Sequence, residues 1–128
     1  MTKEQLRQYR YLKKEIILLE EEIEKLRASL LAPPKPDGLP KSNYAVDRTA
    51  NTIAKIVDLE KKLQEVINDY IAVRTQIEKS IESLQSDERL IIRYRYVEGM
   101  SWEEIAVAMN YTYRHVTRMH GWALKKMS

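Results

Sequence analysis

The chain contains no cysteine and no phenylalanine, and its 128 residues include only three glycines and four prolines. Because cysteine is absent, disulfides and thiolate metal sites are excluded. The chain also lacks a run of about 18 apolar residues, which a membrane-spanning helix would need. Its first residues, Met-Thr-Lys-Glu-Gln, are charged and do not form the apolar core of a signal peptide. We therefore expect a cytoplasmic protein that has no membrane partner.

Charge is unevenly distributed along the chain. The net charge of +3 is mild, and the first 85 residues are nearly balanced, with 15 basic and 14 acidic side chains. From residue 110 to residue 128 the charged side chains are all basic, and they are Arg114, Arg118, Lys125 and Lys126. A cationic end on a nearly neutral body predicts a surface that binds phosphate.

Two segments carry the apolar spacing of long amphipathic helices. In residues 1–31 the apolar positions alternate in steps of three and four: Tyr9, Leu12, Ile16, Leu19, Ile23, Leu26 and Leu30. In residues 47–84 the same heptad continues at Ile56, Leu59, Leu63, Val66, Tyr70, Val73, Ile77 and Leu84. Between them, residues 32–46 hold all four prolines and predict a linker. Two such helices most simply form an antiparallel, coiled-coil-like hairpin.

The second predicted helix has more apolar surface than a two-helix seam uses. Its stripe widens at Ile53, Ile67 and Ile81. This surplus can pack on the C-terminal domain or on a second copy of the chain, which would make a homodimer through the long helices. The heptads alone do not choose between these partners.

The last part of the chain, residues 85–128, predicts three short helices. Ser86 can cap the first, which would run to Val97, and Gly99 can end it in a left-handed conformation. Ser101 and Glu104 have the spacing of a capping box for a second helix that ends near Met109. The third helix follows a turn at residues 110–112, with Thr112 as its cap, and extends to about residue 126.

The last two of these helices satisfy the demands of a helix-turn-helix. The tight crossing needs a small residue where Ala106 stands, and the turn needs a residue that tolerates positive φ where Asn110 stands. Apolar residues fall at the buried positions of the crossing: Ile105, Met109, Tyr111, Val116 and Met119. We assign Trp102 and Trp122 to packing of the same small core.

The remaining positions of the last helix point to DNA binding. Arg114 and Arg118 share one helix face, and each can bind guanine O6 and N7 in the major groove. Tyr113 and Thr117 can contact a thymine methyl group or a phosphate, and His115 can hydrogen-bond to a phosphate or a base. The other candidates are phosphate contacts at helix starts and at the chain end: Ser101, Thr112, Lys125 and Lys126.

Catalytic and metal-binding patterns are missing from the sequence. There is no glycine-rich phosphate loop, and no nucleophile stands near a plausible base. His115 and His120 have no partner at ligand spacing. We therefore expect a protein that is not an enzyme and that needs no cofactor and no metal ion.

A family resemblance covers the C-terminal third of the chain. Two segments resemble region 4 of sigma-70-type factors: LQSDER at residues 84–89 and RYVEGMSWEEIA at residues 95–106. The whole layout is similar to the RinA/ArpU-type phage transcriptional regulators, with residues 117–120 and 123–124 also in register. The resemblance implies promoter binding and activation of phage late genes through RNA polymerase. It also implies that the final helix reads a −35 element through Arg114, His115, Thr117 and Arg118.

These observations predict an all-α protein, with a long helical hairpin followed by a small three-helix domain that contains a helix-turn-helix. The function that we expect is that of a phage or prophage transcriptional regulator that binds double-stranded DNA and contacts RNA polymerase. Two alternatives stay open. Small terminase-like packaging proteins also pair a helix-turn-helix with long oligomerising helices, and a helical adaptor would bind the polymerase rather than DNA.

Overall fold

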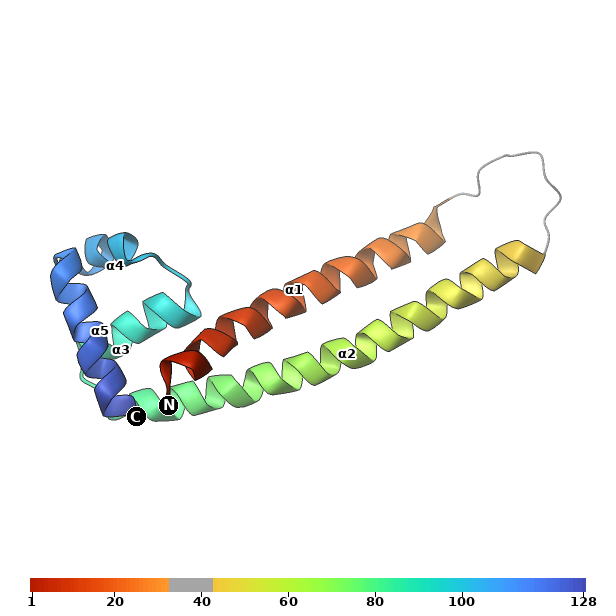
Figure 1. The fold of residues 1–128 in the computed structure, drawn as a ribbon. Coiled ribbons are helices and arrows are strands. Elements are labelled where there is room, and N and C mark those ends of the chain that lie inside the picture. Colours follow the sequence, from red (N-terminus) through yellow and green to blue (C-terminus); the bar gives the residue numbers. More distant parts are fainter. Residues whose placement is uncertain (33–42) are drawn as a thin grey trace. The chain divides into compact units, whose positions relative to one another are not determined.

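The computed structural model describes residues 1–32 and 43–128, which form helices joined by short turns and contain no strand (Figure 1). The helices are α1 (Lys3–Leu31), α2 (Asn43–Ile81), α3 (Ser86–Ile92), the π-helical turn η1 (Arg93–Val97), α4 (Trp102–Met109) and α5 (Tyr113–Met127). The predicted all-α class, with long helices followed by a small helical domain, is confirmed. The prolines of the predicted linker lie outside the described residues, and α2 begins before the predicted start at residue 47.

The chain divides into two compact units. One unit, called the core unit below, combines Met1–Lys13 with Asp69–Ser128, and the other, called the two-helix unit, is Lys14–Asn68. The core unit therefore contains the beginning of α1 and the end of α2 as well as all the short helices. The two-helix unit contains only the remaining parts of α1 and α2.

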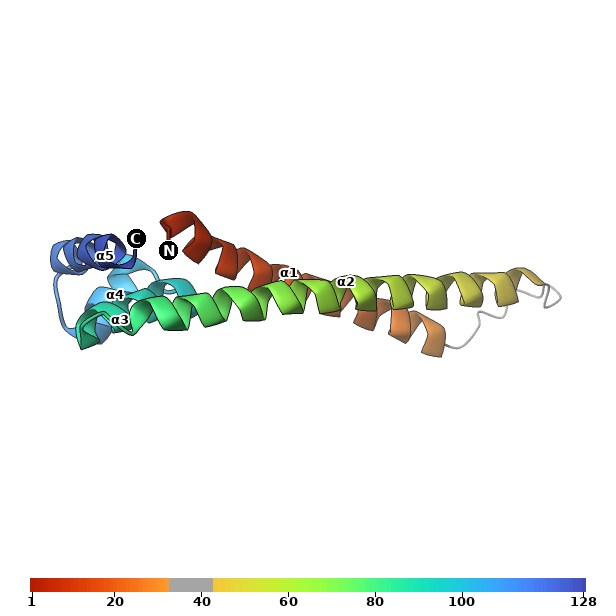
Figure 2. The ribbon, with the colours of Figure 1, turned by 90° about the horizontal axis from the view of Figure 1, so that it is seen from below.

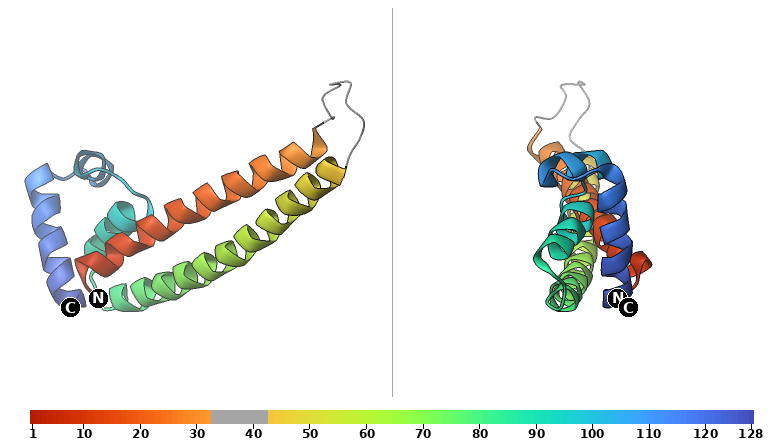
Figure 3. Two further views of the ribbon diagram at one scale, coloured as in Figure 1. Left: turned by 45° about the vertical axis from the view of Figure 1, so that its right-hand side comes forward. Right: turned by 90° about the vertical axis from the view of Figure 1, so that its left-hand side faces the viewer.

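In the two-helix unit, α1 and α2 run antiparallel, as each of the views shows (Figures 1, 2 and 3). The buried side chains of this unit stand at predicted heptad positions: Leu19, Ile23, Ile56 and Val66. An exposed ion pair joins Arg27 to Glu60 across the two helices. The predicted antiparallel pairing is thus confirmed for this unit.

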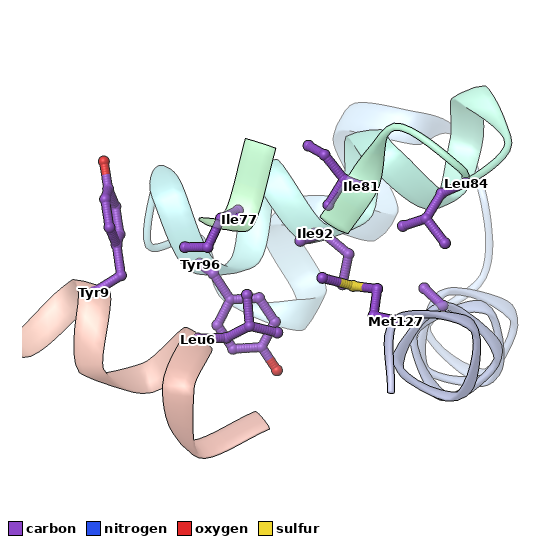
Figure 4. Packing of buried hydrophobic residues seen from close by; sticks show 9 residues of the cluster. Leu6, Tyr9, Ile77, Ile81, Leu84, Ile92, Tyr96 and Met127 are labelled. Atoms are coloured by element: carbon purple, nitrogen blue, oxygen red, sulfur yellow. The ribbon is translucent and has the colours of Figure 1, made fainter. Parts of the chain in front are cut away.

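The larger hydrophobic cluster of the core unit draws residues from both ends of the chain (Figure 4). Its buried members are Leu6, Tyr9, Ile77, Ile81, Leu84, Ile92, Tyr96, Ala123 and Met127. Leu6 is fully buried, although the apolar positions named from the sequence begin only at Tyr9. The core around α3 and α5 therefore extends beyond residues 85–128 and includes the first turns of α1.

Polar contacts also join the first residues of the chain to α2 and α5. The hydroxyl groups of Tyr9 and Tyr70 lie 2.7 Å apart in a hydrogen bond, and the two rings stack at 4.8 Å between centroids. The Met1 ammonium group donates to the carbonyl oxygen of Met127 at 2.5 Å. The N and C termini accordingly lie side by side in this unit (Figure 3).

A second cluster holds the helix-turn-helix together. It consists of the buried side chains Ile91, Ile105, Ala106, Val116 and Met119, with Met109 and Trp102 partly buried at its edge. The predicted crossing is confirmed at these positions. The prediction for Tyr111 is wrong: its side chain is 36% exposed, and its hydroxyl donates to Asp87 Oδ2 at 2.7 Å. A phenol that reaches a carboxylate at the surface gains more there than by burying its polar hydroxyl.

The two tryptophans differ in their surroundings. Trp102 packs against the second cluster, as predicted. Trp122 is 49% exposed, so its assignment to the core is wrong. The buried face of α5 runs through Val116, Met119 and Ala123. Trp122 is about 100° around the helix from Ala123 and one turn from the exposed Arg118, so it stands at the exposed margin of that face.

The segment before α4 departs from a single regular helix. Ser86 is the first residue of α3 rather than its cap, and Gln85 holds the cap position without a side-chain hydrogen bond. The helix then widens into η1, where the Glu98 amide donates to the Arg93 carbonyl oxygen at 2.9 Å. Gly99 has φ of +71°, which confirms the predicted left-handed end.

Candidate nucleic-acid interface

The α4–turn–α5 segment is fixed by two side-chain helix caps and one residue in the left-handed conformation. Ser101 Oγ accepts from the Glu104 amide at 3.1 Å, and Thr112 Oγ1 accepts from the His115 amide at 3.1 Å. Asn110 adopts φ 57° and ψ 41° at the end of α4. All three predictions are confirmed, and each uses a residue whose own side chain or backbone preference suits its position.

The loop that leads into α4 is held from η1. Arg95 Nη1 donates to the Met100 carbonyl oxygen at 3.0 Å, and its guanidinium lies 4.4 Å from the centroid of the Trp102 ring. This cation–π contact covers one side of the half-buried tryptophan. The start of α4 is therefore fixed both by its cap and by the preceding turn.

Helix α5 has one apolar face and one cationic face. Val116, Met119, His120, Ala123 and Met127 are buried. On the opposite side, the exposed residues Arg114, Arg118, Gly121 and Lys125 form a single row, because they are spaced three or four residues apart. The helix contains no acidic side chain. The cationic row is thus uninterrupted by negative charge.

Tyr113 and Thr117 flank this row and offer different chemistry. Tyr113 is 49% exposed, so its ring is accessible. Thr117 is half-buried, and its hydroxyl lies within hydrogen-bond distance of the carbonyl oxygens of Tyr113 and Arg114, at 3.1 and 3.0 Å. Because the hydroxyl proton is directed into the helix, we expect Thr117 to contact DNA through its methyl group rather than as a donor.

The two capping residues are unequal as phosphate ligands. The Ser101 hydroxyl, besides accepting from an amide, donates to Glu104 Oε1 at 3.2 Å. Its proton is engaged, and the first turn of α4 carries the carboxylates of Glu103 and Glu104, which repel phosphate. Thr112 accepts from the His115 amide, and the first turn of α5 carries no carboxylate. We therefore expect Thr112 to bind phosphate more readily than Ser101.

His115 and Lys126 are already engaged within the domain. The half-buried ring of His115 packs edge-on against Tyr111, with 4.8 Å between centroids. The hydrogen bond to Asp87 raises the pKa of the Tyr111 hydroxyl. Lys126 Nζ donates to Oε1 of the buried Glu88 at 2.7 Å, whereas Lys125 stands exposed on the cationic row. Their DNA contacts stay predictions, and Lys126 would have to leave a carboxylate to bind a phosphate.

Comparison with protein families identifies this part of the chain. Residues 74–127 match the profile of the family described as Sigma-70, region 4. A sigma-70 region 4 domain is thus detected over this segment, which is less than half of the chain. Domains of this type are helix-turn-helix domains that bind DNA and RNA polymerase, which indicates a DNA-binding, transcription-related role. Comparison with curated proteins and with solved structures gave no match.

The match to the region 4 domain agrees with the packing of the core unit. It begins inside α2, so it includes Ile77 and Ile81, which lie in the larger hydrophobic cluster. The match does not reach Leu6 and Tyr9, which complete the same cluster from α1. In this protein a region 4 domain is therefore closed by a helix that lies outside the family profile.

His120, which lies within the matched region 4 segment, is buried although the sequence analysis does not predict a structural role for it. His120 Nε2 forms a 2.7 Å hydrogen bond with the Tyr96 hydroxyl, and its ring packs against those of Tyr96 and Trp102. Burial, aided by the nearby charges of Lys3 and Arg95, lowers the pKa of His120 to about 4. The imidazole is neutral at pH 7. Helical spacing could have revealed it, because His120 lies one turn from both Val116 and Ala123.

The described residues set limits on other kinds of site. Across residues 1–32 and 43–128, no three histidine, aspartate or glutamate side chains come together in a way that could hold a metal ion. None of the described helices is long and apolar enough to cross a membrane.

Proposed function

We propose that this protein is a transcriptional regulator that inserts the first turns of α5 into the major groove of promoter DNA. The observation that carries this proposal is the row Arg114, Arg118 and Lys125 on the exposed face of the helix-turn-helix helix of a region 4 domain. A recognition helix presents its N-terminal turns to base edges, and an arginine there reads guanine bidentately. The protein acts by binding rather than by catalysis.

The side chains divide between base reading and backbone contact. Arg114 and Arg118 read guanine, and the methyl group of Thr117 contacts thymine. Thr112, at the start of α5, binds a phosphate together with the free amides of that helix end. Lys125, three helical turns after Arg114 on the same row, contacts the phosphate backbone. Tyr113 packs against the wall of the groove.

Footprinting followed by fluorescence anisotropy on the protected fragment tests this function. Arg114→Ala and Arg118→Ala should each weaken binding by about 1–3 kcal/mol and relax the sequence preference at one position. Arg48→Ala, which removes an exposed arginine from the two-helix unit, is the matched control and should leave binding unchanged. The affinity should fall steeply with salt, with about one unit of logarithmic slope for each phosphate contact. Unchanged affinity in both α5 variants at low salt would exclude direct reading by α5.

The finer proposal is activation of phage or prophage late genes through RNA polymerase. It rests on the resemblance to RinA/ArpU-type regulators and on the general ability of region 4 domains to bind the polymerase. Transcription from the footprinted promoter with purified polymerase should rise when the protein is added, and Arg118→Ala should abolish that rise. If the protein captures polymerase and stimulates transcription but never protects DNA, it is instead an adaptor.

The two-helix unit is proposed to pair two copies of the chain. Its exposed apolar side chains Ile17, Leu18, Ile53 and Val57 are 43–57% exposed, although they lie on helices that already pack together. A dimer would place two α5 helices on half-sites about one helical turn of DNA apart, or a multiple of it. Light scattering after gel filtration measures the mass, and Ile53→Lys should shift a dimer to monomer. A ring of eight or more subunits would favour the packaging alternative.

A further inference from the structure

Gly121 has no structural reason to be glycine. It lies inside α5, six residues before the helix ends at Met127, and its φ is not positive, since Gly99 is the glycine with positive φ in the described residues. A Cβ built on Gly121 would meet no heavy atom within 4 Å. Neither a turn, nor a helix cap, nor close packing within the protein therefore calls for the missing side chain.

The protein loses stability by keeping glycine at this position. Glycine in the interior of an exposed helix is less favourable than alanine by about 1 kcal/mol, because its backbone loses more conformational freedom on folding. A stabilising methyl group would fit here without any rearrangement. Close approach of the backbone to a binding partner is another use of glycine, and it does not depend on contacts inside the protein.

The position of Gly121 identifies that partner. It lies one helical turn after Arg118 and one turn before Lys125, on the exposed row that also contains Arg114. The row is cationic on both sides of Gly121, and at Gly121 itself only a hydrogen atom projects from the helix backbone. Two arginines and a lysine around a bare stretch of helix backbone suit a polyanion that presses against the helix.

We infer that Gly121 is the point at which the backbone of α5 comes closest to duplex DNA, so that its hydrogen atom sets how deeply α5 enters the major groove. This inference rests on the proposed function. A methyl group would place a carbon about 1.5 Å out from Cα and push the helix away from the groove. Arg114 and Arg118 would then reach the guanine edges less well. Gly121 is thus a positioning residue for base reading.

Gly121→Ala and Gly121→Leu test this inference by separating stability from binding. Gly121→Ala should raise the Tm by about 3–5 °C, because alanine favours the helix. The same variant should weaken binding to the footprinted site about tenfold, which is the loss of one good base contact, and Gly121→Leu should weaken it further. Binding to unrelated DNA should fall less, because phosphate contacts tolerate a shallower helix.

Ala72→Leu, an enlargement of an exposed side chain on α2, is the control and should leave DNA affinity unchanged. Binding of Gly121→Leu at wild-type affinity would overturn the inference, and so would a fall in both Tm and affinity for Gly121→Ala. If Arg114→Ala loses binding while both Gly121 variants keep it, the proposed function stands and the role of Gly121 falls. If the wild-type protein binds no DNA, both fall together.

Discussion

The core unit and the two-helix unit share the helices α1 and α2, but they bury side chains to different depths. In the core unit Leu6, Ile92 and Val116 are 0% exposed. In the two-helix unit the most buried side chain is Ile23, at 5%, among the residues that the structure describes. Two helices can cover each other along one seam only, whereas several elements can enclose a side chain from all directions. The same heptad pattern thus produces a closed core in one region and a partly open seam in the other.

The polar residues repeat this contrast. Glu88 and His120, the buried polar side chains of the described part, both lie in the core unit. Each has a partner there: Lys126 for the carboxylate and Tyr96 for the imidazole. In the two-helix unit the ion pair between Arg27 and Glu60 is exposed, and such pairs contribute little. The core unit therefore encloses both its apolar and its polar side chains, while the two-helix unit leaves apolar side chains such as Leu18 and Ile53 exposed.

The largest test of this contrast is to remove the same side chain from each unit. Ile92→Ala should lower the free energy of unfolding by about 3–5 kcal/mol, because it leaves a cavity in a closed core. Ile56→Ala, in the two-helix unit, should lower it by only about 1–2 kcal/mol, because its side chain lies on an open seam. Urea unfolding followed by circular dichroism measures both. Equal losses would contradict the difference in packing.

The tie between the first turns of α1 and the region 4 domain gives the next effect. Leu6→Ala should lower the free energy of unfolding by about 2–4 kcal/mol, although it lies far along the chain from the domain that it supports. Leu18→Ala, on the same helix but 57% exposed, should change it by no more than about 0.5 kcal/mol. Both tryptophans lie in the core unit, so their fluorescence reports its unfolding. If the two variants melt alike, α1 does not close this core.

A smaller loss should follow from breaking the partly buried ion pair between Lys126 and Glu88. Lys126→Ala leaves the buried carboxylate of Glu88 without its cation. Glu88 Oε2 already has no hydrogen-bond partner. Because Lys126 itself is 48% exposed, water can partly replace it, and we expect a loss of about 1–2 kcal/mol. Lys125→Ala should be neutral for stability and should weaken DNA binding instead. A loss of stability in Lys125→Ala together with unchanged stability in Lys126→Ala would contradict these two roles.

The smallest effect near neutral pH should come from His120. Its pKa is lowered to about 4 in the folded protein, while an unfolded chain has about 6.5. The unfolded state therefore binds more protons between these values, and the free energy of unfolding should fall as the pH falls from about 6.5 to about 4. His120→Gln removes this dependence because glutamine does not titrate. Thermal melts across the range measure it, and a variant with the same acid-induced loss as wild type would argue against the buried neutral histidine.

Much of the helix-turn-helix was predictable because its requirements are local. Asn110 takes a left-handed conformation that few residues tolerate, and Thr112 caps the helix that follows it. Ala106 allows the two helices to cross. Each of these requirements concerns one residue and its immediate neighbours, so it can be recognised from the amino-acid sequence. The region 4 profile matches the same part of the chain.

The errors concern residues whose surroundings come from elsewhere in the chain. Tyr111 has the apolar body of a core residue, but Asp87 on α3 offers its hydroxyl a surface partner. Trp122 is large and aromatic, yet the face of α5 that α3 and α4 cover does not include it. Leu6 lies outside the predicted heptad positions, because the local pattern in the first turns of α1 does not show that a domain beginning near residue 74 packs there.

Helical periodicity was enough to predict the helices, most of their ends, the helix crossing and the shared face of Arg114 and Arg118, because it decides which side chains lie on one face. What covers each face depends on tertiary packing. It placed the start of α1 in the core of the region 4 domain, and it engaged Lys126 with Glu88. Burial depends on neighbours that are distant in the chain, and a pattern along the chain does not contain them.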